Sequence, residues 1–124
     1  MRFGFDIHGV LDTKPKLYSK LTKRLVMLGH EVHVITGASI TDRLVQQLKD
    51  WGIAYHKLFS IADYHKKLGT PINYSDSDNP WMDEKIWDRT KAEYCDREAI
   101  NLHIDDSPEY GKYFKSTIYL EIKK

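Results

Sequence analysis

The chain has 124 residues and a mass of 14.6 kDa. This length fits one domain, since domains commonly contain about 100–150 residues. Its net charge of +1 gives no overall field that would favour nucleic acid or an anionic membrane, and a hydrophobic content of 41% is enough to form a core. The single Cys95 excludes an intramolecular disulfide, and Asp6 and His8 interrupt any signal-like apolar segment at the start. No apolar run approaches the ~20 residues that span a bilayer. We therefore expect a soluble cytoplasmic protein.

The first half of the chain predicts strands that alternate with helices. Leu17, Leu21, Leu25 and Leu28 recur at helical spacing along one side of the first helix. The predicted order is a strand over 2–7, a loop over 8–15, a helix over 16–28, a strand over 32–36, a helix capped by Ser39 and stopped by Gly52, and a strand over 53–59. Short connections between such elements favour a parallel sheet with right-handed crossovers.

The second half begins with a segment, 60–88, that breaks this rhythm with Gly69, Pro71 and Pro80. A helix is expected to begin between residues 80 and 88 and to run to about residue 98. Strands are expected over 102–105 and, at the edge of the sheet, over 117–122. We predict one α/β domain over 1–124, a three-layer Rossmann-like fold with about five parallel strands and an irregular insertion at 60–88.

Polar groups follow three of the predicted strands. Asp6 ends the first strand, Thr36 and Gly37 end the second, and the pair Asp105 and Asp106 ends the fourth. Functional groups of parallel α/β sheets collect at the carboxyl ends of the strands. Carboxylates that converge there repel one another, so a cation is expected among them, and hard oxygen ligands favour Mg²⁺ over Zn²⁺.

These motifs resemble those of the haloacid dehalogenase (HAD) superfamily. The segment Asp6-Ile7-His8-Gly9-Val10 matches the first motif except for its second acid, Val32-His33-Val34-Ile35-Thr36 matches the second, and Leu102-His103-Ile104-Asp105-Asp106 matches the fourth. Each motif is weak alone. Their order along nearly the whole chain identifies it as similar to a small, cap-less member of that superfamily.

The resemblance implies a role for each strand-end residue. Asp6 would be the nucleophile that attacks phosphorus and forms an aspartyl-phosphate. The Thr36 hydroxyl, with nearby backbone N–H groups such as that of Gly37, would bind the phosphoryl oxygens. Asp105 would bind Mg²⁺ directly, with Asp106 as a second ligand or as the residue that orients a water. The metal, bound also by Asp6, would shield that carboxylate from the incoming dianion.

The superfamily also requires a lysine that neutralises the nucleophile and the phosphate. Lys91 fits if it opens the helix before the last acidic strand, with Asp88 as the N-cap. If the helix begins at Pro80 instead, Lys91 lies ~16 Å along it and Lys85 becomes the better candidate. We favour Lys91.

His8 departs from the family pattern, because phosphatases of this superfamily usually carry an aspartate there as general acid and base. A metal contact made by the backbone carbonyl at this position would survive the change. An imidazole can exchange protons near neutrality, so His8 would act as the acid/base, slow the turnover, or mark lost catalysis. All three readings stay open.

We therefore expect a Mg²⁺-dependent phosphomonoester hydrolase acting on a small phosphorylated substrate, such as a nucleotide or a sugar phosphate. A phosphorylated end of a larger molecule stays open, and no membrane partner is expected. The alternative is a catalytically impaired HAD-like protein that binds phosphate or metal, with His8 in place of the acid. The insertion is too short for a cap domain, so we expect an open site or one covered by loops or a partner subunit. Its aromatic residues form either a lid or a satellite cluster, and the candidates are Tyr64, Tyr74, Trp81 and Trp87.

Overall fold

The computed structural model describes residues 1–70 and 82–123 and contains one five-stranded sheet. All strand pairs are parallel, and the strand order is β3-β2-β1-β4-β5. The strands are β1 (Arg2–Phe5), β2 (Glu31–Thr36), β3 (Lys57–Ser60), β4 (Leu102–Asp105) and β5 (Ile118–Glu121). The predicted α/β class and the sheet of about five parallel strands are confirmed, and the architecture is Rossmann-like.

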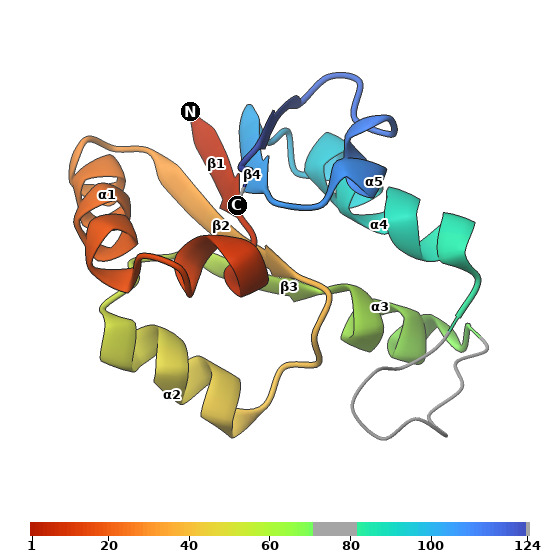
Figure 1. Ribbon diagram of the computed structural model, residues 1–124, viewed down its shortest axis with the longest axis horizontal. Helices are drawn as coiled ribbons and strands as arrows, with labels where there is room; N and C mark the ends of the chain where they lie inside the picture. Colours follow the sequence, from red (N-terminus) through yellow and green to blue (C-terminus); the bar gives the residue numbers. More distant parts are fainter. Residues whose placement is uncertain (71–81, 124) are drawn as a thin grey trace.

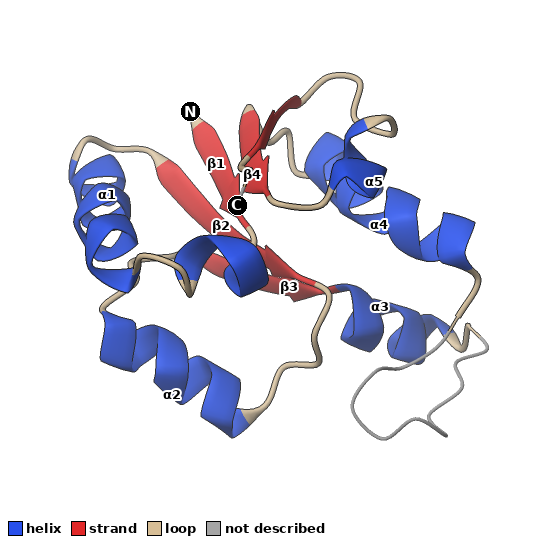
Figure 2. Cartoon of the chain, viewed as in Figure 1, coloured by secondary structure: helices blue, strands red, loops and turns tan. Residues whose placement is uncertain are grey.

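Helices cover both faces of this sheet (Figures 1 and 2). Two of them, α1 and α2, lie on one face, and α3 and α4 lie on the other. A short turn of helix, η1, follows β1 directly. The bounds are η1 (Ile7–Leu11), α1 (Pro15–Met27), α2 (Asp42–Trp51), α3 (Ile61–Leu68), α4 (Glu84–Arg97) and α5 (Pro108–Gly111).

The alternation of side chains along the strands separates two hydrophobic cores. Val34 packs with Phe5 in the cluster beneath α1 and α2, whereas its neighbour Ile35 packs with Tyr94 and Cys95 of α4. Successive residues of a strand point to opposite faces, so an apolar run such as Val34-Ile35 is expected in a sheet buried on both sides. This burial fixes the register of β1, β2 and β4 and hence the positions of the residues at their ends.

The chain changes direction across the sheet at β1. From β1 it continues to β2 and β3 on one side, and it returns through α4 to β4 and β5 on the other. In open parallel sheets, ligands bind at the crevice where the strand order reverses, beyond the carboxyl ends of the strands. That crevice lies here between β1 and β4. Among the described residues, no helix is long and apolar enough to cross a membrane.

The segment after β1 differs from the prediction. The strand β1 ends at Phe5 rather than at residue 7, and the predicted loop begins with the compact turn η1 (Ile7–Leu11), in which His8 and Gly9 have non-helical backbone angles. Val10 and Leu11 are fully buried in the core beneath α1 and α2. Burial of these two side chains holds the turn against the sheet, an effect that glycine and proline signals do not reveal.

The predicted leucine stripe of α1 is wrong at three of its four positions. Leu17, Leu21 and Leu28 are 54%, 37% and 64% exposed, whereas Leu25 packs against the core as predicted. Tyr18 and Thr22 are buried instead, and the Thr22 hydroxyl donates to the Tyr18 carbonyl and accepts a hydrogen bond from the Ala54 N–H. A polar residue thereby joins the helix to the chain before β3, and hydrophobic spacing alone does not indicate this.

The starts of α2 and β3 differ from the predicted ones. Thr41, not Ser39, caps α2, since its hydroxyl accepts a hydrogen bond from the Leu44 N–H at 3.1 Å. The third strand begins at Lys57 rather than residue 53. Ile53 is buried in the core beneath α1 and α2 although it precedes the strand, which explains why this position is apolar.

The described residues of the insertion, 60–70 and 82–88, are more regular than predicted. The insertion begins with α3, capped by the Ser60 hydroxyl, which accepts from the Asp63 N–H, and ended by the left-handed Gly69. The capping signal was present in the sequence and was missed. Tyr64 packs on Phe59 in this region, as a satellite cluster would. Trp81 and Tyr74 fall outside the described residues. The short α5 before β5 was also not predicted.

Candidate functional site

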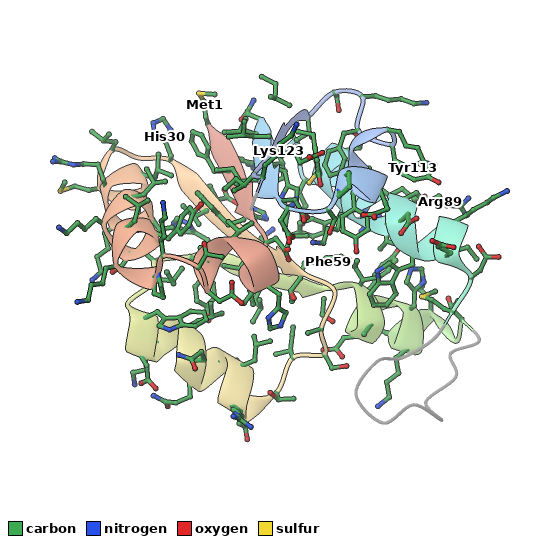
Figure 3. The ribbon with its side chains drawn as sticks, viewed as in Figure 1. Met1, His30, Phe59, Arg89, Tyr113 and Lys123 are labelled. Carbon is green, nitrogen blue, oxygen red and sulfur yellow. The ribbon has the colours of Figure 1, made fainter. Side chains whose placement is uncertain are left out.

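The first feature of the site is a pair of buried carboxylates bridged by one lysine. The Lys91 ammonium donates to Asp6 Oδ1 at 3.0 Å and to Asp105 Oδ2 at 2.7 Å. All three side chains are at least 92% buried. Asp6 follows β1 and Asp105 ends β4, and these strands pair directly, with Phe5 opposite Ile104. The site lies at the carboxyl edge of the sheet, opposite the amino edge where Met1 and His30 meet (Figure 3).

Asp105 is the better-stabilised carboxylate of the pair. Its Oδ1 accepts the N–H groups of Asp106 and Ser107 at 2.8 and 3.2 Å. Its Oδ2 accepts from Lys91 and from His103 Nε2 at 2.9 Å. Burial alone would raise the pKa of Asp105, but the bonds from His103 and Lys91 outweigh it and hold the pKa below its usual range. Asp105 is therefore ionised at neutral pH.

Asp6 is the less-stabilised carboxylate. Burial raises its pKa from 3.8 to about 7, the Lys91 ammonium opposes that shift, and the nearby Asp105 adds to it. Its only hydrogen-bond donor recorded among the described residues is Lys91. A buried acid with one cationic partner, shared with a second acid, lacks counter-charge. The site would therefore gain from additional positive charge near Asp6.

Lys91 reaches the site from an unexpected position on α4. The helix is capped by Asp83, not Asp88, so Lys91 does not open it and lies about 10 Å from its first residue. The middle of α4, rather than its start, passes the carboxyl edge of the sheet. The prediction that Lys91 opens this helix was therefore wrong. The choice of Lys91 nevertheless agrees with the geometry, because Lys85 is exposed. Burial lowers the pKa of Lys91, but Asp6 and Asp105 outweigh it and raise that pKa to about 12.

His103 supports Asp105 from within β4. Because a carboxylate only accepts hydrogen bonds, His103 Nε2 carries the proton, and Nδ1 has no partner among the described residues. Burial lowers the pKa of His103, so the ring is neutral. Its Nδ1 faces Gly4 on β1, where an added Cβ would lie only 2.7 Å away. Gly4, two residues before Asp6, therefore leaves the space that the imidazole beside Asp105 occupies.

Asp106 meets the turn that follows Asp6. Gly9 has a φ of +88°, and a Cβ there would lie 2.1 Å from Asp106 Oδ2. The Gly9 N–H donates to Asp12 Oδ1 at 2.8 Å. Only glycine combines this positive φ with so close an approach, so Gly9 brings η1 against the third carboxylate of the site.

The carboxylates of Asp6, Asp105 and Asp106 are close enough together to hold a cation. One carboxylate oxygen from each of Asp6, Asp105 and Asp106 lies within 4.8 Å of the others. With Lys91 counted, three carboxylates and one ammonium leave a net charge of −2, which a divalent cation would neutralise, and the donor set is all oxygen. A carboxylate has about four lone-pair sites, and Asp105 already accepts four bonds. Direct ligation by Asp105 would therefore replace one of these four bonds.

Thr36 and Gly37 lie at the end of β2, next to β1. The Thr36 side chain is fully buried, and its Oγ1 accepts from the Ala38 N–H at 3.2 Å, which leaves the hydroxyl hydrogen to be donated elsewhere. Gly37 packs against Trp87, whose ring would lie 2.8 Å from an added Cβ. The structure therefore places both residues at the same sheet edge as Asp6, and it covers Gly37 with an aromatic ring.

Two aromatic residues near the site were not recognised as a pair. Trp87 donates its indole N–H to the Tyr110 hydroxyl at 3.1 Å, and the Tyr110 ring lies 4.9 Å from Lys91 Nζ. The sequence singled out Trp87 within a possible lid, but Tyr110 carried no signal. These two side chains form a wall beside Gly37 and Lys91, contributed by α4 and α5.

His8 does not join the acidic cluster. Its side chain is 69% exposed, and Nδ1 lies 3.6 Å from Asp12 Oδ2. His8 instead lines an open pocket between η1 and α2. Of the predicted site residues, the structure brings Asp6, Lys91, Asp105 and Asp106 together, with Thr36 and Gly37 at the adjoining strand end. The imidazole of His8 lies beside Asp12 and lines the pocket between η1 and α2.

Comparisons with known proteins do not extend this description. No family model matches the chain, and no curated protein and no solved structure shows a significant match. The fold and the site define a Rossmann-like α/β protein with a lysine-bridged aspartate cluster at the reversal point of its sheet. The family resemblance remains a prediction from the motifs.

Proposed function

We propose that the protein is a Mg²⁺-dependent phosphomonoester hydrolase of the HAD type that works through an aspartyl-phosphate on Asp6. The observation that supports this best is the buried bridge from Lys91 to Asp6 and Asp105 at the carboxyl edge of adjacent strands. A structural salt bridge needs only one acid for each lysine. Two further acids around one ammonium leave the negative charge that a cation and a phosphoryl transfer site require.

In this proposal an Asp6 oxygen bonds to phosphorus while the bond to the leaving-group oxygen breaks, and that oxygen takes up a proton. Water then attacks the phosphorus of the aspartyl-phosphate, loses a proton, and releases inorganic phosphate and the free Asp6 carboxylate. Lys91 holds Asp6 in place and offsets the charge of the phosphoryl group. The Thr36 hydroxyl and the Gly37 N–H donate to the phosphoryl oxygens. Mg²⁺ bound by Asp6, Asp105 and Asp106 would shield the nucleophile from the dianion.

The test is release of phosphate from 4-nitrophenyl phosphate with Mg²⁺, compared between the natural protein and Asp6→Asn. We expect the substitution to reduce turnover by at least ~10³-fold, because it removes the nucleophile. Turnover that survives Asp6→Asn would exclude the aspartyl-phosphate mechanism. The control is Asp50→Asn, an exposed acid on α2 that belongs neither to the three-aspartate cluster nor to the lining of the pocket between η1 and α2.

The position of His8 favours a second candidate, a phosphate- or metal-binding protein with little or no turnover. The imidazole is mostly exposed, pairs with Asp12 and lies outside the acidic cluster. Phosphate or beryllofluoride binding without turnover on a panel of phosphorylated metabolites would support it. A His8→Asp variant separates the cases. A gain of turnover identifies His8 as an attenuator, and a loss identifies it as the acid/base.

A further inference from the structure

We propose that the open pocket between η1 and α2 receives the leaving group of the phosphomonoester, and that this group is an aromatic or heteroaromatic ring. The proposal rests on the proposed function, because it places the phosphoryl group at Asp6. It adds a second site, the η1–α2 pocket, which has a volume of about 390 Å³. Part of its lining comes from the segments that follow β1 and β2, the strands that end near Asp6 and at Thr36.

Two chain segments lead from the acidic edge of the sheet into the walls of this pocket. Ile7 and His8 follow Asp6 directly, so this wall begins within about 8 Å of the nucleophile along the chain. Thr41 lies five residues after Thr36 and lines the pocket at the start of α2. Because β1 and β2 are adjacent and parallel, the segments that leave their carboxyl ends start side by side, and residues of both segments line the pocket.

The side chains of the η1–α2 pocket indicate what it would hold. Leu44, Leu48 and Trp51 come from one side of α2 and supply an apolar and aromatic wall. Ile7 of η1 lines the pocket, where its side chain is mostly covered by the core. Apolar walls with a few polar groups are typical of small-molecule pockets, and the volume is within their usual range of about 300–1,000 Å³. A flat ring would bury its faces against these residues.

Polar groups surround this apolar wall. Arg43 and Gln47 are exposed on α2 and line the pocket, and His8 lines it from η1. Asp12 holds this arrangement, since its carboxylate accepts the Gly9 N–H and lies 3.6 Å from the His8 ring. The exposed orientation of His8, which leaves it outside the acidic cluster, is therefore the orientation that borders the leaving group.

The experiment compares two non-hydrolysable probes, phenylphosphonate and methylphosphonate, in the presence of Mg²⁺. Both offer the same phosphoryl group, and only phenylphosphonate carries a ring. Calorimetric titration of the natural protein is expected to show phenylphosphonate binding about 10-fold more tightly, as partial burial of one ring implies. Amide NMR shifts that differ between the two probes are expected at His8 and along 41–47.

Two variants of α2 test the location of the ring. Gln47→Trp places a large side chain in the pocket, whereas Gln46→Trp places it on the adjacent exposed position, which does not line the pocket. We expect Gln47→Trp to remove the preference for phenylphosphonate and leave the methylphosphonate affinity unchanged. Gln46→Trp should keep both affinities within about twofold of the natural protein.

Each outcome decides a different part of the proposal. Equal affinity for both probes in the natural protein, or a ring preference that survives Gln47→Trp, overturns the assignment of the pocket and leaves the phosphoryl site standing. If neither probe binds, the proposed function fails, and the pocket assignment fails with it. The NMR comparison needs no variant, so a folding defect in Gln47→Trp would not remove the test.

Discussion

Asp6 and Asp105 end adjacent strands, are both buried and share one lysine, yet their environments differ. Asp105 accepts four hydrogen bonds and stays ionised, whereas Asp6 accepts one from Lys91 and its pKa is raised to about 7. Burial is common to both, so the number of donors decides the difference. The well-satisfied acid is suited to a fixed structural or ligand role. The poorly satisfied one is suited to react or to accept added positive charge.

The largest effect is expected from removing the ammonium that both acids share. Lys91→Met should lower the free energy of unfolding by about 3–5 kcal/mol, because it leaves two buried carboxylates without their cation. Chemical denaturation at pH 7.5 measures this. Lys85→Met is the control, since Lys85 is exposed, and it should change stability by less than about 0.5 kcal/mol. Similar losses for the two variants would contradict the bridge.

The next prediction compares the two acids directly. Asp105→Asn should cost about 3 kcal/mol, because the new amide NH₂ would face groups that can only donate. Asp6→Asn keeps an oxygen for Lys91 and removes an under-compensated charge, so at pH 7.5 without metal it should not lower the free energy of unfolding. Denaturation of both variants under the same conditions tests the ranking. The reverse order would show that Asp6 is the structural acid.

The dependence of stability on pH provides a further test. The folded-state pKa of Asp6 lies above its unfolded value, so its contribution to stability is complete below about pH 4 and is lost as pH rises toward about 7. Without metal, the natural protein should therefore lose stability relative to Asp6→Asn over this window, by on the order of a few kcal/mol. Parallel denaturation curves from pH 4.5 to 8 measure the difference. A constant difference would mean that the pKa of Asp6 is not raised.

Mg²⁺ should act in the opposite direction across the same range. A cation binds the ionised form of Asp6, so stabilisation by Mg²⁺ should increase between pH 6 and 8 and should be smaller in Asp6→Asn. Thermal unfolding with and without Mg²⁺ at several pH values measures this. Equal stabilisation of the two proteins would place the cation elsewhere.

The smallest effect concerns His103. Leucine and glutamine at this position both remove the ring that packs on Phe114, but only glutamine keeps an N–H donor for Asp105. We expect His103→Leu to bind Mg²⁺ about 10-fold more weakly than His103→Gln. Calorimetric titration compares the two. Identical Mg²⁺ affinities for the two variants would limit His103 to a packing role. The leucine variant should also be about 1 kcal/mol less stable to unfolding than the glutamine variant, because it lacks the bond to Asp105.

Much of the fold could be predicted because its signals are local. Gly29 and Gly52 end the first two major helices with positive φ, as the sequence indicates, and β4 spans the predicted residues. The errors lie where the buried face depends on distant partners. Tyr18 and Thr22 are buried where leucines of α1 were predicted, and burial of Val10 and Leu11 makes a compact turn within the predicted loop.

Part of the candidate site could be predicted for a related reason. Strand-end acids in a parallel sheet must share one edge, so the meeting of Asp6 and Asp105 follows from the order of the elements. Tyr110 and the supporting bond from His103 could not be predicted, because they depend on how α4, α5 and β4 pack. Lys91 was chosen on a helix register that the structure does not have.

The sequence by itself determined the succession of strands and helices, and with it the edge at which the acids gather, because hydrophobic periodicity and capping residues act over a few positions. Only the tertiary structure decided that Asp105 is well supplied with hydrogen-bond donors and that Asp6 lacks positive charge around it. It also decided that the His8 imidazole is exposed and lines the η1–α2 pocket rather than joining the acidic cluster. Hydrogen bonding and desolvation depend on atoms brought together from distant segments, so spacing along the chain carries no record of them.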